Sequence, residues 1–203
     1  YMAIVAHALT TVARVKARVL PDTSVTAWDS LIAELINGAT DVIEAFVGRR
    51  FATATYTNEV YSITPGRTIV YLRHWPVTAV SSAQYRAGTP DNPNWTTLLA
   101  SEYELKEDGR QGAIKLYTAL KGINVFRITY TAGYTIDFTA GDTKLPFSVS
   151  EVCERMVVHR FKKRTDEGKS ADSADGGSVT WNTDDISPMD QKILRQFQRP
   201  IFV

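Results

Sequence analysis

A long amphipathic helix pattern over residues 29–47 constrains the fold of this sequence more than any other feature. Apolar residues recur there at the spacing of one helical face, with a second apolar row beside it: Leu31, Leu35, Ala39, Val42 and Phe46, then Ile32, Ile36, Ile43 and Val47. Such a wide apolar face must pack against other parts of the protein. We therefore expect Leu35, Val42 and Phe46 to be among the core residues.

Both ends of this helix are marked in the sequence. Thr26, with Asp29 three residues later, predicts a capped start. Gly48 can adopt the left-handed conformation that ends a helix, and Arg49 and Arg50 suit the negative end of the helix dipole. Sequence typical of β-strands follows, so a second region is expected to begin there.

Three further helices are expected. Thr10 or Thr11 can cap a first helix that ends before Pro21, because the residue before a proline disfavours helical geometry. Ser148 and Glu151 have the spacing of a capping box and predict the start of a third helix.

Ser187 and Pro188 predict the start of a last helix, with Met189, Ile193 and Phe197 lining one face until Pro200. Residues 165–179, before it, are rich in Gly, Ser and Asp, and we expect them to be the least ordered part of the chain.

The middle of the chain is rich in Thr, Tyr and alternating apolar residues, a composition that favours strands. Residues 53–61 and 68–72 flank Pro65 and Gly66, and we expect them to form a hairpin. Further strands are expected over residues 77–85, 103–106, 113–117 and 125–131, the second of these pairing with the third. The sequence thus predicts an α+β fold, with a helical bundle from residues 1–51 and 146–203 and an antiparallel β-rich insertion over residues 52–145.

The charge balance and the cysteine count exclude several classes of protein. Lys and Arg number 23 against 22 Asp and Glu, so the sequence has no overall basic footprint for nucleic acid. The single cysteine, Cys153, excludes an intrachain disulfide, and its place on the inner face of a helix favours core packing over nucleophilic chemistry. No apolar run approaches the ~20 residues that a membrane span needs.

Candidate catalytic and metal-binding residues are few. His7, His74 and His159 lie in different predicted elements, and none has a His or Cys at metal-ligand spacing. The carboxylates of residues 102–108 are interleaved with basic residues, which is typical of a solvated edge. No phosphate-loop, nucleophile-elbow or zinc-protease motif occurs. We therefore expect no enzymatic activity, no metal and no cofactor; a hydrolase with an unrecognised site is the least favoured alternative.

Positive charge is concentrated in two predicted helices near the C-terminus. The residues are Arg155, Arg160, Lys162, Lys163, Arg164, Lys192, Arg195 and Arg199. They suit a solvated helix face and the negative helix ends, and a local contact with DNA phosphates is the alternative. The second candidate function is accordingly a DNA-binding module that uses the basic C-terminal helices.

Four segments, taken in order, resemble the head-tail connector proteins of tailed bacteriophages, also called adaptor or head completion proteins. They are residues 9–16, residues 41–51 with their Gly48-Arg49-Arg50-Phe51 ending, residues 75–80 and residues 127–134. The resemblance implies a structural virion protein in the neck between capsid and tail, assembled in the host cytoplasm. Such a protein forms a ring under the portal, extends the DNA channel for packaging and ejection, and joins the capsid to the stopper or tail.

The resemblance also implies partners. These are the portal protein, the stopper or tail-completion protein, further copies of the chain, and double-stranded DNA that passes without sequence specificity; no membrane is implied. The ring is expected to be dodecameric in the virion and the isolated subunit to be a monomer.

The C-terminal segment is the candidate portal-binding site. Its residues are Arg195, Arg199, Ile201, Phe202 and Val203, in which an apolar end lies beside two cations. An apolar chain end is expected to be covered by the chain's own core or by a partner. For Met189, Ile193 and Phe197, packing into the chain's own bundle is an equally open interpretation.

Overall fold

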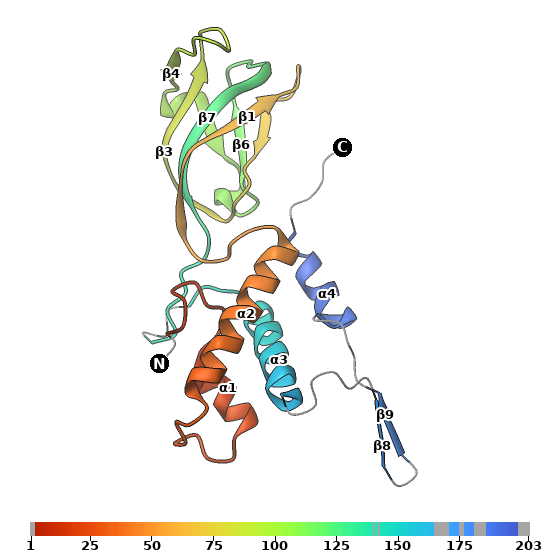
Figure 1. Cartoon of the computed structure of the whole chain (residues 1–203). Helices are drawn as coiled ribbons and strands as arrows, with labels where there is room; N and C mark the ends of the chain where they lie inside the picture. The colour runs from red at the N-terminus through yellow and green to blue at the C-terminus, as the bar shows by residue number, and fades with distance from the viewer. Residues whose placement is uncertain are drawn as a thin grey trace. The chain divides into compact units, whose positions relative to one another are not determined.

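The computed structural model describes residues 3–139, 141, 143–164, 171–174, 177–180 and 186–198, with only the backbone of 171–174 and 177–180. The chain divides into two compact units. We call Tyr1–Phe51 with Ile136–Val203 the helical unit and Ala52–Thr135 the β unit (Figure 1). The expected α+β class is confirmed.

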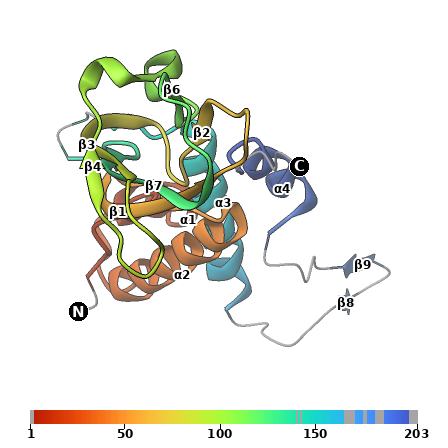
Figure 2. The ribbon, with the colours of Figure 1, turned by 90° about the horizontal axis from the view of Figure 1, so that it is seen from above.

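The helical unit is built from helices that pack side by side (Figures 1 and 2). Its elements are α1 (Val12–Val19), α2 (Asp29–Val47), α3 (Phe147–Lys163), the short strands β8 (Ala171–Ala174) and β9 (Gly177–Thr180), and α4 (Pro188–Arg195). Helix α2 contacts α1, α3 and α4, so it is the element around which the unit is organised.

The long predicted helix is confirmed as α2, but its buried face is displaced from the expected one. Ile32, Ile36 and Ile43 are fully buried, together with Ala39 and Val47. The residues predicted for the core, Leu35, Val42 and Phe46, are only half-buried. Both rows are apolar, so the helical periodicity did not distinguish the row that faces α3 from the one at the margin.

The predicted helix ends are confirmed at some positions and wrong at others. Thr11 caps α1 by accepting a hydrogen bond from the Arg14 amide, and Gly48 ends α2 with φ of 76°. Thr26 provides no side-chain cap, because Trp28 is the N-cap residue of α2.

The predicted capping box at Ser148 is also wrong. Helix α3 begins at Phe147, directly after Pro146, and has no side-chain cap. At α4 the prediction is confirmed, since Ser187 caps the helix and Pro188 is its first residue.

Two antiparallel sheets make up the β unit. A four-stranded sheet has the order β1 (Ala54–Ile63), β7 (Gly122–Ala132), β3 (Val77–Arg86) and β4 (Trp95–Thr97). A three-stranded sheet has the order β2 (Ile69–Tyr71), β6 (Ala113–Leu116) and β5 (Tyr103–Leu105), with 3₁₀ turns at Ala100–Glu102 and Lys106–Gly109.

Both sheets contribute to one apolar core. Every second residue of the end of β7 is buried in it, including Phe126, Ile128 and Tyr130. Ile114 and Leu116 of β6 belong to the same core. The predicted hairpin between residues 53–61 and 68–72 is wrong, because β1 pairs with β7 while β2 pairs with β6. The predicted pairing of residues 103–106 with 113–117 is confirmed by β5 and β6.

The chain enters and leaves the β unit through adjacent strands. Ala52 forms a bridge with Tyr134, and the Thr53 amide donates to the Tyr134 carbonyl at 3.0 Å. Gly133 has φ of +114°, and a Cβ there would lie 2.5 Å from the Ala52 oxygen, so only glycine fits.

The segment predicted to be least ordered lies largely outside the described residues. Residues 165–170 and 175–176 are not described, whereas β8 and β9 pair as an antiparallel hairpin. Among the described residues, no helix is long and apolar enough to cross a membrane.

Candidate assembly site

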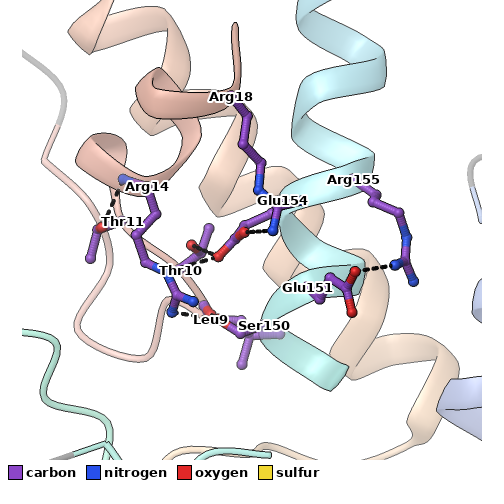
Figure 3. Close-up of polar contacts among 9 residues, drawn as sticks. All are labelled: Leu9, Thr10, Thr11, Arg14, Arg18, Ser150, Glu151, Glu154 and Arg155. Atoms are coloured by element: carbon purple, nitrogen blue, oxygen red, sulfur yellow. Dashed lines mark hydrogen bonds and ion pairs between the residues drawn. The ribbon is translucent and has the colours of Figure 1, made fainter. Parts of the chain in front are cut away.

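A buried carboxylate fixes α1 against α3 (Figure 3). Glu154 is only 1% exposed, although it is charged. Its Oε1 accepts from the Thr10 hydroxyl at 3.0 Å and lies 3.1 Å from Arg14 Nε, while its Oε2 lies 2.7 Å from Arg18. Arg14 and Arg18 are one helical turn apart on α1, so both reach the same carboxylate. We call Thr10, Arg14, Arg18 and Glu154 the α1 clamp.

A second contact extends the α1 clamp toward the start of α3. The Ser150 hydroxyl donates to the Leu9 carbonyl at 2.6 Å and accepts from Arg14 at 3.3 Å. Buried charges are tolerated in proteins when they are paired and hydrogen-bonded, and here all of the partners come from α1 and the residues before it. Helix α1 is therefore held largely by polar contacts, since Val15 is its only fully buried apolar residue.

A similar contact fixes α4. The buried carboxylate of Asp190 accepts from Arg155 Nε at 3.0 Å and from the Ser187 hydroxyl at 2.7 Å. Arg155 also pairs with Glu151 one turn earlier on α3, at 2.9 Å. The start of α4 is thus attached to the middle of α3.

The end of α4 is attached to α2. Leu194 is fully buried, and the Phe197 ring meets the Phe51 ring edge-on at 5.9 Å between centroids. The Gln198 side chain donates to the Phe46 carbonyl at 2.8 Å. The chain up to Gln198 is therefore anchored in the helical unit, at the C-terminal end of α2.

The structure places the predicted portal-binding residues only in part. Arg195 is exposed on the last turn of α4. Arg199, Ile201, Phe202 and Val203 lie outside the described residues.

The apolar face expected for the last helix is partly corrected. Met189 is 71% exposed, whereas Ile193 and Phe197 are half-buried. Leu194 and Asp190, which the face did not include, are the buried residues. The buried face of α4 is therefore one position from the expected one, and its residue Asp190 pairs with Arg155.

Part of the basic cluster is engaged within the chain. Arg155 is paired as described, and Arg164 donates to the Phe161 carbonyl at 2.6 Å and lies over the Phe161 and Trp28 rings. Lys162, Lys192 and Arg195 are exposed. Arg164 thus makes the helix-end contact expected for the basic cluster, whereas Arg155 forms an ion pair with a buried carboxylate, which the expectation of a solvated face did not include.

Glu44 holds the chain where α2 ends. Its Oε1 accepts from the Phe51 amide at 3.0 Å, and its Oε2 lies 3.9 Å from His7 Nε2. Burial raises the pKa of the Glu44 carboxyl above its usual value, and the Phe51 amide partly opposes this rise. The carboxylate therefore fixes the turn of Gly48 to Phe51.

Cys153 is fully buried on α3. Burial raises the pKa of its thiol to about 12, so the reactive thiolate is not populated at neutral pH. Among the described residues, no group of three or more His, Cys, Asp or Glu is placed to hold a metal ion.

The carboxylates predicted to line a solvated edge have local structural roles. Glu102 accepts from the Leu99 amide at 2.7 Å, and Glu104 accepts from the Tyr117 hydroxyl at 2.7 Å. Lys106 lies 3.5 Å from Glu104.

Sequence reasoning missed the α1 clamp and the Arg155–Asp190 pair. A signal was present, because Glu154 falls between Cys153 and Met156 on the apolar side of its helix. A carboxylate at such a position must find cationic partners if it is buried. Arg14 and Arg18, spaced by four residues on a short helix, were the available pair.

The polar contacts described above join the helices of the helical unit to one another.

A sequence profile of the Head completion protein family matches residues 8–200, so the chain belongs to that family. It is a structural protein of the virion and acts as a head-tail connector. No curated protein matches the sequence.

Solved neck structures share the fold. A chain in "Neck of empty GTA particle computed with C6 symmetry" has a TM-score of 0.61 and 15% identity, covering 100% of this chain and 95% of that chain. A chain in "Neck of native GTA particle computed with C12 symmetry" has a TM-score of 0.57 and 15% identity, with the same coverage. A third, from "Virion of native gene transfer agent (GTA) particle", has a TM-score of 0.51 and 16% identity, covering 88% of this chain and 81% of that chain.

Proposed function

We propose that the chain forms a closed ring beneath the portal, extends the DNA channel, and joins the capsid to the stopper or tail. The anchored course of α4 is the observation that carries this proposal, because it delivers the C-terminal residues from a fixed point on the subunit. The symmetric necks named above, solved with C6 and C12 symmetry, support a ring of twelve copies. The subunit performs no catalysis in this role, and it assembles in the host cytoplasm before it reaches the neck.

The portal arm in this proposal is the end of the chain rather than the whole last helix. Asp190, Leu194 and Phe197 are held by α3, α2 and Phe51, so α4 itself stays in the subunit. Arg195 is exposed at the base of the arm, and Arg199, Ile201, Phe202 and Val203 form the arm. An apolar chain end with two cations suits a groove of the portal that is apolar and acidic.

A tail truncation tests the portal arm. A chain that ends at Arg199 should keep its circular dichroism spectrum, since the anchors up to Gln198 remain, and should lose portal binding in a pull-down. The matched control keeps the length and replaces Ile201, Phe202 and Val203 with serine; it should also fail to bind. Portal binding equal to that of the full chain would place the arm elsewhere.

Double-stranded DNA is proposed to pass through the ring without being gripped. The near-neutral charge of the chain supports this, since a DNA-binding protein neutralises many phosphates and binds less tightly as salt rises. An ionic-strength series on duplex binding separates the connector from the DNA-binding alternative. Binding that weakens steeply with salt, and that is lost with Lys192 and Arg195 changed to glutamate, would favour the alternative.

Native mass spectrometry tests the ring. The isolated subunit should be a monomer and should form a twelve-membered species only with the portal present. A stable monomer in the presence of a portal that binds other neck proteins would contradict the proposed ring.

A further inference from the structure

An exposed aromatic and cationic surface lies at the N-terminal end of α2, and the portal arm does not use it. Trp28, the N-cap residue of α2, is 37% exposed, and Val25 in the preceding loop is 39% exposed. Arg164, just after α3, is exposed beside Trp28. We call Val25, Trp28, Phe161 and Arg164 the Trp28 patch.

The Trp28 patch is held in one arrangement by its own contacts. Trp28 meets the buried ring of Phe161 edge-on at 5.7 Å between centroids. The Arg164 guanidinium lies 4.2 Å from the Phe161 centroid and 4.8 Å from that of Trp28, while one of its nitrogens donates to the Phe161 carbonyl. Tryptophan and arginine are the residue types most enriched among those that dominate binding energy, and a surface ordered in advance loses little entropy on binding.

The position of the Trp28 patch is opposite to the portal arm within the helical unit. The arm leaves from the C-terminal end of α2, where Gln198 contacts Phe46 and Phe197 contacts Phe51. The Trp28 patch lies at the N-terminal end of the same 19-residue helix, and a helix of that length spans about 27 Å. Figure 1 shows the α1–α2 connection and the end of α3 together at this far end of the unit. The Trp28 patch and the residues that anchor the arm therefore lie at opposite ends of α2.

The charges around the Trp28 patch indicate the chemistry of its partner. Arg164 is exposed at the end of α3 and lies over the Trp28 ring, whereas Asp29, next to Trp28, is paired with Lys16 at 2.8 Å. The Arg164 guanidinium is thus the charge in contact with the exposed ring, and it complements a carboxylate flanked by an apolar side chain.

We propose that the Trp28 patch is the docking surface for the stopper or tail-completion protein, on the side of the subunit opposite to the portal. The partner inserts an apolar side chain against Trp28 and Val25 and places a carboxylate on Arg164. This inference rests on the proposed function, since it assigns a second surface to the same connector.

The test compares two charge reversals on the assembled connector. Arg164→Glu puts a negative charge into the Trp28 patch, whereas Lys162→Glu makes the same change two residues earlier, at a residue that is not part of the Trp28 patch. The portal and stopper proteins of the same virion are titrated against each variant. Arg164→Glu should weaken stopper binding about tenfold or more, while portal binding and ring size stay unchanged and Lys162→Glu stays near wild type.

A second variant guards against loss of folding. Val25→Ser removes apolar contact from an exposed loop residue, so it should leave the fold intact and weaken stopper binding by a smaller factor than Arg164→Glu. Stopper binding unchanged in both Arg164→Glu and Val25→Ser would overturn the inference. Loss of ring formation with stopper affinity retained would also overturn it, because the surface would then join copies of the chain. A wild-type chain that binds neither portal nor stopper would instead contradict the proposed function.

Discussion

The two units of this protein are stabilised in different ways. In the β unit, one apolar core takes residues from both sheets, with Phe126, Ile128 and Tyr130 fully buried. In the helical unit, the core of α2 and α3 is supplemented by buried carboxylates, Glu154 and Asp190, each paired with arginine. The short helices α1 and α4 have eight residues each, and they depend on these pairs.

This difference indicates which part of the subunit should be sensitive to salt and to charged partners. Apolar burial is insensitive to moderate salt, whereas an ion pair with partly exposed arginines weakens as salt screens it. Helices attached through ion pairs can be released or re-paired by a partner with charges of its own. The helical unit, and α1 and α4 in particular, is therefore the adaptable part of the connector.

The largest effect is expected from Phe126→Ala in the β unit. Removing this fully buried ring should cost about 3–5 kcal/mol, because it leaves a cavity between the two sheets. Hydrogen exchange read by mass spectrometry should show lost protection in the strands and retained protection in α2 and α3. Equal loss of hydrogen-exchange protection in both units would mean that they unfold together. It would contradict the view that the two units are stabilised separately.

A smaller effect is expected within α2, where the two apolar rows can be compared directly. Ile43→Ala should cost about 2–5 kcal/mol, and Phe46→Ala about 1–2 kcal/mol, although phenylalanine is the larger residue. The reason is that Ile43 is fully buried and Phe46 only half-buried. Chemical denaturation measures both, and the reverse order would show that the Phe46 row faces the core.

Arg18→Ala tests the α1 clamp. Glu154 keeps Arg14 and Thr10 as partners, so the loss of one charge-assisted contact should cost about 1.5–3 kcal/mol. The cost should shrink between about 0.1 M and 1 M salt, whereas that of Phe126→Ala should not. The measurement is denaturation at both salt concentrations; parallel behaviour of the two variants would remove the distinction between the units.

The smallest effect is the pH dependence contributed by Glu44. Burial raises its pKa in the folded state, so the folded chain binds this proton more tightly than the unfolded chain. The resulting stability is present below the unfolded pKa and is lost as the pH rises through the raised folded value. Glu44→Gln should flatten the fall in stability over the acid range, measured by chemical denaturation at a series of pH values. A pH profile of stability identical to that of the wild type would contradict the effect assigned to Glu44.

The sequence predicted the elements whose signals are local. Residues 29–47 carry a complete helical period and Gly48 a stop signal, and the turn between β5 and β6 joins strands that are close in sequence. The predicted hairpin between β1 and β2 was wrong because β1 pairs with a strand that is distant in the sequence. The ten residues of β1 pair with the eleven-residue strand β7, about 60 residues later, whereas β2 has three residues.

Tertiary contacts also decided the details of the site. The start of α4 followed from Ser187 and Pro188, but its orientation follows from Arg155 and Asp190, which are 35 residues apart in sequence. Only a fold that brings α3 and α4 together pairs these charges. The sequence could indicate that Glu154 needs a cation, yet it could not say that two arginines of α1 supply it.

The bridge between Ala52 and Tyr134 brings together the two places where the chain enters and leaves the β unit. Because these residues are adjacent, a few residues could connect the two parts of the helical unit if the β unit were removed. Exchange of this segment as one piece would leave in place the ion pairs of Glu154 and Asp190, which lie within the helical unit. Connectors that share the helical unit are then free to differ in what they carry between α2 and α3, and that segment is where the diversity of necks should be sought.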